Sequence, residues 1–191
     1  MSDGLIVLLL VIVFGIFVAI MIGPWLIRTY NVFVLGKNKI QELWSNVEVQ
    51  LKRRYDLIPN IVSTVKGYAK HEDTVFTQVT EARSQAMTAA TPAQHQQFDA
   101  RLMGGLASLY AVAEAYPDLK ASTQFQGLQE QLREVEDGIE EARTAYNAGV
   151  SRFNTLVQKF PNNLLAGLFG VTAAEFYNAP AEADDVVSVT L

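Results

Sequence analysis

The sequence contains no cysteine and only two histidines, His71 and His95, among its 191 residues. The absence of cysteine excludes disulfide bonds, thiolate metal sites, a cysteine nucleophile and a lipoprotein anchor. It agrees with a reducing compartment without establishing one. With two histidines and no cysteine, the chain offers few residues that could form a catalytic nucleophile–histidine pair, and no glycine-rich phosphate-binding loop occurs. These absences argue against an enzyme and against any bound metal or other cofactor.

The acidic residues do not suggest a metal site either. His71 precedes Glu72 and Asp73, but adjacent residues on a helix point in different directions, which favours a solvated turn. Four more carboxylates occur at helical spacing: Glu136, Asp137, Glu140 and Glu141. Di-metal bundles need such acids together with Glu-x-x-His pairs that face the core. Here the acids lie off the apolar positions, so a solvated face is predicted.

An uncharged stretch dominates the N-terminal region and runs through 23 residues, from Leu5 to Ile27, without a charged or amide side chain. At 1.5 Å per residue it measures about 35 Å, enough to cross a hydrocarbon core of about 30 Å. The preceding residues carry the acid Asp3 and no base, and no small-x-small cleavage site follows. The pattern predicts an uncleaved signal anchor over residues 1–28 rather than a signal peptide. Residues that mark the predicted membrane span along its length are Leu5, Ile12, Phe17, Ile22 and Ile27.

Basic residues follow the span, and acids collect near the opposite end. The bases are Arg28, Lys37, Lys39, Lys52, Arg53 and Arg54. The positive flank predicts an N-terminus outside and a C-terminal domain in the cytoplasm. These bases either contact anionic headgroups or only set the topology, and the sequence favours neither reading. The last seventeen residues contain four acids and no base, and residues 179–191 are predicted to form an acidic tail.

Helical periodicity covers the chain after the span. Apolar residues recur at alternating steps of three and four from Phe125 to Phe160, with Gly149 as the one gap, which is typical of a long bundle or coiled-coil helix. The same steps run from Ile40 to Val79, with Glu72 in one seam position. Pro59 interrupts the hydrogen bonding of that helix, and because the seam continues in phase a kink is expected rather than a loop.

A shorter helix lies between these two. Thr91 is the expected N-cap and Pro92 the first helical residue. Gln94, three residues after Thr91, is the expected glutamine of a capping box. The predicted fold is therefore all-α, with an antiparallel bundle of three to four long helices over residues 29–160. Gly36 and a nearby asparagine leave open whether the span continues into the bundle without a break.

An apolar segment, residues 161–178, follows the bundle. Pro161 stops the long helix, and the stretch from Leu164 to Val171 carries no charge. It is too short to span a bilayer, so it caps the bundle, docks on a neighbouring subunit or enters the membrane interface; capping is the simplest reading. The interface candidates in this segment are Leu164, Leu165, Leu168 and Phe169.

Three charged residues precede Pro59. Arg53 and Asp56 are spaced for a surface ion pair, while Arg53 and Arg54 beside a kink suit contact with another subunit or with lipid phosphate. The triplet of bases at residues 52–54 is too small to indicate nucleic-acid binding in an acidic chain.

The segment WSNVEVQLKRRYDLIPNIVSTVKGYAKHE, from Trp44 to Glu72, resembles the signature of the LemA family of bacterial membrane proteins. Other stretches that fit the family pattern are Glu81-Ala82-Arg83, Tyr30-Asn31, Tyr146-Asn147 and Phe153-Asn154 through Phe160-Pro161. The resemblance covers nearly the whole chain. It implies an N-out anchor in the bacterial inner membrane, a cytoplasmic helical bundle and no established enzymatic activity. One branch resembles a protein that forms magnetosome membranes, which implies membrane shaping by analogy.

Two functional hypotheses follow. The first is a non-enzymatic anchor protein that forms homo-oligomers and scaffolds or remodels the bilayer. The second is an adaptor or regulator of another membrane protein, such as a protease or a sensor kinase, with the acidic tail as its docking peptide. Particle size separates them, because a scaffold forms large homo-oligomers without a partner.

Overall fold

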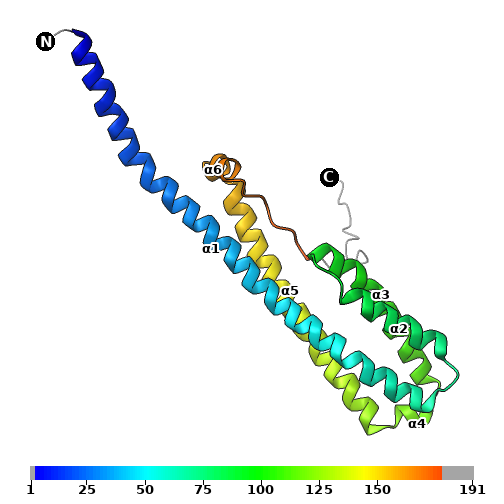
Figure 1. The fold of residues 1–191 in the computed structure, drawn as a ribbon. Coiled ribbons are helices and arrows are strands. Elements are labelled where there is room, and N and C mark those ends of the chain that lie inside the picture. Colours follow the sequence, from blue (N-terminus) through cyan, green and yellow to red (C-terminus); the bar gives the residue numbers. More distant parts are fainter. Residues whose placement is uncertain (1–2, 178–191) are drawn as a thin grey trace, which may run out of the picture. The chain divides into compact units, whose positions relative to one another are not determined.

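The computed structural model describes residues 3–177, so the predicted acidic tail, residues 179–191, lies outside the described part of the chain. Residues 3–177 form helices connected by short turns and contain no strand, which confirms the all-α prediction (Figure 1). The helices are α1 (Asp3–Tyr68), α2 (Asp73–Ala86), α3 (Pro92–Glu114), α4 (Pro117–Lys120), α5 (Thr123–Gln158) and α6 (Asn162–Phe169).

Helix α1 continues without a break from the predicted span through Gly36 and Pro59 to Tyr68. The prediction that Pro59 does not split the helix is confirmed, and the kink itself stays a prediction. The apolar pattern that runs to Val79 is divided between two helices, because residues 69–72 form a turn; the sequence favoured a solvated turn at residues 71–73. The backbone carbonyl of Glu72 then accepts from the amide of Phe76 at 3.3 Å in the first turn of α2.

The chain divides into two compact units, and α1 and α5 contribute residues to both. Among the described residues, unit 1 comprises residues 3–41 and 150–174, and unit 2 comprises residues 42–149 and 175–177. The core of unit 1 joins α1, α5 and α6 through Phe33, Phe153, Val157, Leu165 and Ala166. The core of unit 2 contains fully buried seam residues from α1, α2, α3 and α5, among them Leu51, Val79, Leu102 and Phe125.

The start of α3 follows the predicted capping pattern. The side-chain oxygen of Thr91 accepts from the backbone amide of Gln94 at 3.2 Å, and Pro92 is the first helical residue. The carboxamide oxygen of Gln94 accepts from the amide of Ala90 at 2.8 Å, one residue before the N-cap. The first bond satisfies an amide that a helix start leaves without an intrahelical partner, and the second ties the residue before the N-cap to the first turn of α3.

Helices α2 and α3 of unit 2 pack closely at Gly105, whereas its neighbour Gly104 faces open space. A Cβ atom added to Gly105 would lie 3.3 Å from Cγ2 and 3.5 Å from Cα of Val79, and one added to Gly104 would meet nothing within 4 Å. We expect Gly105→Leu to lower the free energy of unfolding by about 1–3 kcal/mol through overpacking. Gly104→Leu should raise it by a few tenths of a kcal/mol through helix propensity. Equal effects in chemical denaturation would contradict this packing.

Candidate functional site

The N-terminal part of α1 has the length and composition of a membrane span. It is the only helix among residues 3–177 that meets this criterion, and none of its most apolar 18-residue window is buried. The predicted span residues all lie on α1, and their side chains are exposed: Leu5, Ile12, Phe17, Ile22 and Ile27. A core helix of a soluble protein would bury such a window, so the exposure favours a lipid-facing segment.

Helix α6 presents a second apolar surface within unit 1. Leu165 and Ala166 are buried in the core, whereas Leu164 and Leu168 are 64% and 73% exposed. Leu164 and Leu168 are four residues apart and therefore share one face of the helix. The ring of Phe169 packs edge-on against Tyr30 of α1, with ring centroids 5.2 Å apart. This contact ties the end of α6 to the part of α1 directly after the span.

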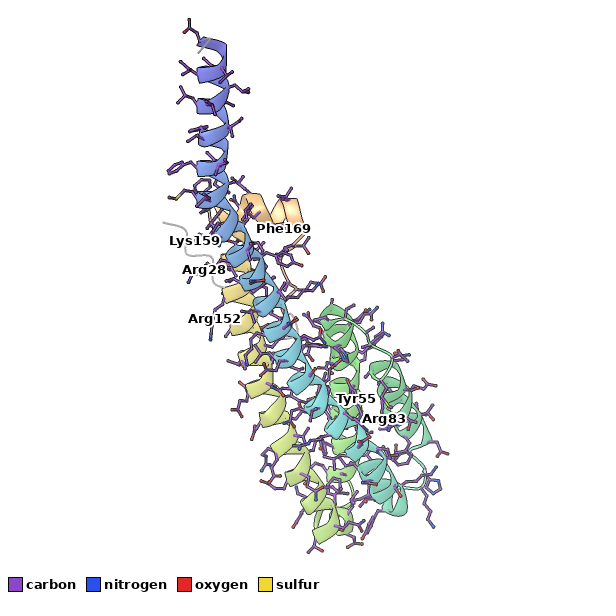
Figure 2. The ribbon with its side chains drawn as sticks, turned by 60° about the vertical axis from the view of Figure 1, so that its left-hand side comes forward. Arg28, Tyr55, Arg83, Arg152, Lys159 and Phe169 are labelled. Atoms are coloured by element: carbon purple, nitrogen blue, oxygen red, sulfur yellow. The ribbon has the colours of Figure 1, made fainter. Side chains whose placement is uncertain are left out.

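The charged residues of unit 1 beyond the span are all basic. Helix α1 supplies Arg28, Lys37 and Lys39, α5 adds Arg152, and Lys159 follows α5 directly, while residues 28–41 and 150–174 contain no acid. Figure 2 shows Arg28, Arg152 and Lys159 along the same stretch of unit 1. We call these five residues the basic cluster. Arg152 and Lys159 were missed from the sequence because residues 42–149, which belong to unit 2, separate them in sequence from the other three bases.

A groove of about 430 Å³ lies within unit 1 between α1 and the segment that follows α6. One wall is a face of α1 that carries Tyr30, Val34 and Lys37. The other wall is residues 169–174, which leave α6 at Gly170 in a left-handed conformation with φ of 64°. The carboxamide of Asn154 fixes this segment through two hydrogen bonds, to the amide of Ala174 at 2.7 Å and to its carbonyl at 2.9 Å.

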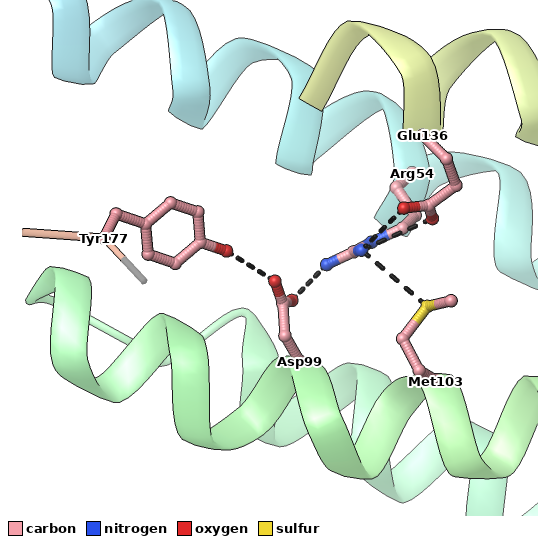
Figure 3. A network of polar contacts seen from close by, with 5 residues as sticks. All are labelled: Arg54, Asp99, Met103, Glu136 and Tyr177. Atoms are coloured by element: carbon pink, nitrogen blue, oxygen red, sulfur yellow. Dashed lines mark hydrogen bonds and ion pairs between the residues drawn. The ribbon is translucent and has the colours of Figure 1, made fainter. Parts of the chain in front are cut away.

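Unit 2 contains a buried ionic network centred on Arg54 (Figure 3). The Arg54 side chain is 2% exposed; it forms an ion pair with Asp99 of α3 and another with Glu136 of α5 at 3.2 Å. The hydroxyl of Tyr177 donates to the second Asp99 oxygen at 2.5 Å. Burial lowers the pKa of Arg54, but Asp99 and Glu136 raise it more, so the net pKa lies above the ordinary value. The network therefore contains a charged guanidinium.

The structure corrects several predictions about individual residues. Arg54 cannot contact lipid or a second subunit as predicted, because it is buried against Asp99. Asp56 pairs with Lys52 at 2.9 Å instead of Arg53. Leu165 belongs to the unit 1 core and not to an exposed interface. The other proposed contact residues are exposed and remain predictions: Arg28, Lys37, Lys39, Lys52, Arg53, Leu164, Leu168 and Phe169.

The end of the described chain docks on unit 2 through its backbone. The carboxamide of Asn147 accepts from the amide of Tyr177 at 2.9 Å and donates to its carbonyl at 2.8 Å. The hydroxyl of Tyr146 donates to the carbonyl of Glu175 at 2.8 Å. The ring of Tyr177 packs against Trp44 at a centroid distance of 5.6 Å. These contacts hold residues 175–177 in place without helix or strand.

His95 lies beside this network and should make stability depend on pH. Burial lowers the pKa of His95 more than the carboxylates of Asp99 and Glu48 raise it, and the charge of Arg54 also lowers it. In the folded protein the His95 imidazole therefore resists protonation, whereas in the unfolded chain it binds a proton below about pH 6.5. We expect the midpoint temperature of thermal unfolding to decrease as the pH is lowered from about 7.5 to 5.5. His95→Phe should make this decrease smaller. The exposed residue His71 provides the control: if His71→Gln weakens the decrease as much, the assignment to His95 is wrong.

Comparison with known proteins places this architecture among bacterial relatives. The family described as the LemA family matches residues 43–191. Magnetosome protein MamQ 2 of Paramagnetospirillum magneticum is 27% identical over 185 residues, which cover 83% of this chain and 68% of the relative. MamQ of Magnetospirillum gryphiswaldense is 24% identical with the same coverage. Protein LemA of Metamycoplasma hominis is 24% identical over 164 residues, 84% of this chain and 71% of the relative.

Proposed function

The chain belongs to the LemA family, and from this premise we propose that it is a non-enzymatic, membrane-anchored helical bundle that self-associates to scaffold or remodel the bacterial inner membrane. The N-terminus lies outside and the bundle in the cytoplasm. One observation carries the proposal. The unit that contains the span also presents the exposed apolar face of α6 beside a basic cluster with no acid.

The exposed face of α6 favours a contact with lipid or with a second copy. Leu164, Leu168 and the preceding Phe160 are each more than half exposed, and Phe160 reaches 72%. An apolar surface of this kind gains free energy when it leaves water, by about 25 cal/mol per Å². The basic cluster draws the same unit toward anionic headgroups. Both forces act on the side of the protein that the anchor holds near the bilayer.

The first test is the mass and shape of the full-length protein in mild detergent, measured by light scattering and electron microscopy. We expect a large, regular homo-oligomer. The same preparation, reconstituted into anionic vesicles, should change their shape as the protein density rises. A monomer or dimer would contradict self-association and would favour an adaptor or regulator of another membrane protein.

A further inference from the structure

The residues that line the groove of unit 1 change from aromatic to polar along its length. Its end nearest the span is aromatic, because the Tyr30 and Phe169 rings pack there. Its far end carries Lys37, Gln41 and Thr172, and its floor includes the buried rings of Phe33 and Phe153. Along α1 the distance from Tyr30 to Lys37 is about 10 Å. The groove is thus apolar toward the membrane and polar away from it.

We propose that this groove binds a single anionic phospholipid, lifted partly out of the adjacent leaflet. The headgroup phosphate lies against Lys37 at the polar end. The upper parts of the acyl chains run past Val34 and Tyr30 toward the bilayer. Tyr30 lies only three residues beyond the last span residue, Ile27, or about 5 Å along the helix, within the headgroup layer. A chain that leaves the groove at Tyr30 therefore re-enters the leaflet directly.

Charge selects an anionic lipid over a second copy of this chain as the occupant. Lys37 is exposed at the rim, and unit 1 has four further bases and no acid beyond the span. Inside the groove, unit 1 of a second copy could bring no acid to pair with Lys37, because residues 28–41 and 150–174 contain none, whereas an anionic headgroup supplies that negative charge. The polar end of the groove also fits a headgroup better than a purely hydrocarbon ligand, which would offer Lys37 no counter-charge. This inference rests on the proposed membrane function and assigns its lipid contact to one site.

Photo-crosslinking of the full-length protein in nanodiscs tests the proposal. The probe is phosphatidylglycerol with a diazirine near the glycerol end of one acyl chain, compared with the same probe on phosphatidylcholine. Val34 lies about 10 Å beyond the span and outside the headgroup layer, so lipid that stays in the bilayer does not reach it. We expect labelled peptides containing Val34, Phe153 or Val171 with the anionic probe, and much weaker labelling with the zwitterionic one.

Three variants sharpen the result. Lys37→Gln should reduce groove labelling by about fivefold, the factor for one base at an anionic surface. Val34→Trp should abolish it by filling the groove, with helicity checked by circular dichroism. Lys66→Gln, an exposed base of unit 2, should leave labelling unchanged.

Labelling confined to residues 5–27 with both probes would overturn the proposal. Equal labelling by the two probes would overturn the anionic assignment, and crosslinks between two copies through the groove would identify a second chain as the occupant. Particle mass separates this proposal from the proposed function. Lys37→Gln weakens lipid binding in the groove without reducing particle mass, whereas failure of self-association appears as a small wild-type particle.

Discussion

Leu168→Asp should abolish assembly of the full-length protein while leaving its helicity intact. The Leu168 side chain is 73% exposed on α6, so a carboxylate there disturbs no core contact. A charge on this face loses the apolar gain of association and must be desolvated when it enters a contact or the membrane interface. Light scattering in mild detergent should show a shift from the large particle to a monomer or dimer, with an unchanged circular dichroism spectrum.

Two matched variants separate assembly from folding. Met87 is 54% exposed in unit 2, so Met87→Asp introduces the same charge at an exposed apolar position outside α6. It should leave assembly intact. Leu165 is only 7% exposed, and Leu165→Asp should instead disrupt the unit 1 core. If Leu168→Asp lowers helicity as Leu165→Asp does, α6 only caps the bundle, and the exposed face is not the assembly surface.

Periodicity and capping predict most of the helical fold because both depend on neighbouring residues. The seam from Phe125 onward predicts α5, which begins at Thr123 and ends at Gln158. The Thr91 cap likewise predicts the start of α3. The sequence predicted a solvated turn beginning at His71, but the periodicity did not show that the helix ends there, because Phe76 and Val79 stay in phase with the earlier seam. A pattern in phase does not distinguish one helix from two that share a core. The local signals were Glu72 in a seam position and the run of polar residues 71–73.

The candidate sites were less predictable because they join residues that are distant in sequence. Arg54 lies three residues after Leu51 and four before Ile58, so its spacing already placed it on the buried face of α1. Asp99 lies three residues before Leu102 in the same way. Two opposite charges at core spacing are a signal for a buried pair. Their 45-residue separation left the pairing open, because periodicity does not fix the register between two helices.

Arg54→Met should lower the free energy of unfolding by about 3–5 kcal/mol, the cost of leaving a buried charge without its partner. The Asp99 side chain is 13% exposed, so water cannot replace the lost guanidinium well. Glu136 is 30% exposed and can turn toward solvent, so Asp99 should dominate the loss. Guanidinium denaturation of the full-length protein, followed by tryptophan fluorescence, measures the change; Trp44 lies in the same unit. Arg53→Met, which changes an exposed neighbour, should cost less than about 0.5 kcal/mol.

The double variant Arg54→Met with Asp99→Leu decides whether the loss comes from the unpaired carboxylate. Replacement of both members of a buried ion pair by apolar residues is often neutral or stabilising, whereas removal of one member is costly. We therefore expect the double variant to be more stable than Arg54→Met alone, by about 1–3 kcal/mol, even though it also removes the hydrogen bond from Tyr177 to Asp99. If the unfolding free energies lost in Arg54→Met and in Asp99→Leu simply add in the double variant, Arg54 acts through its packing among the helices rather than through its charge.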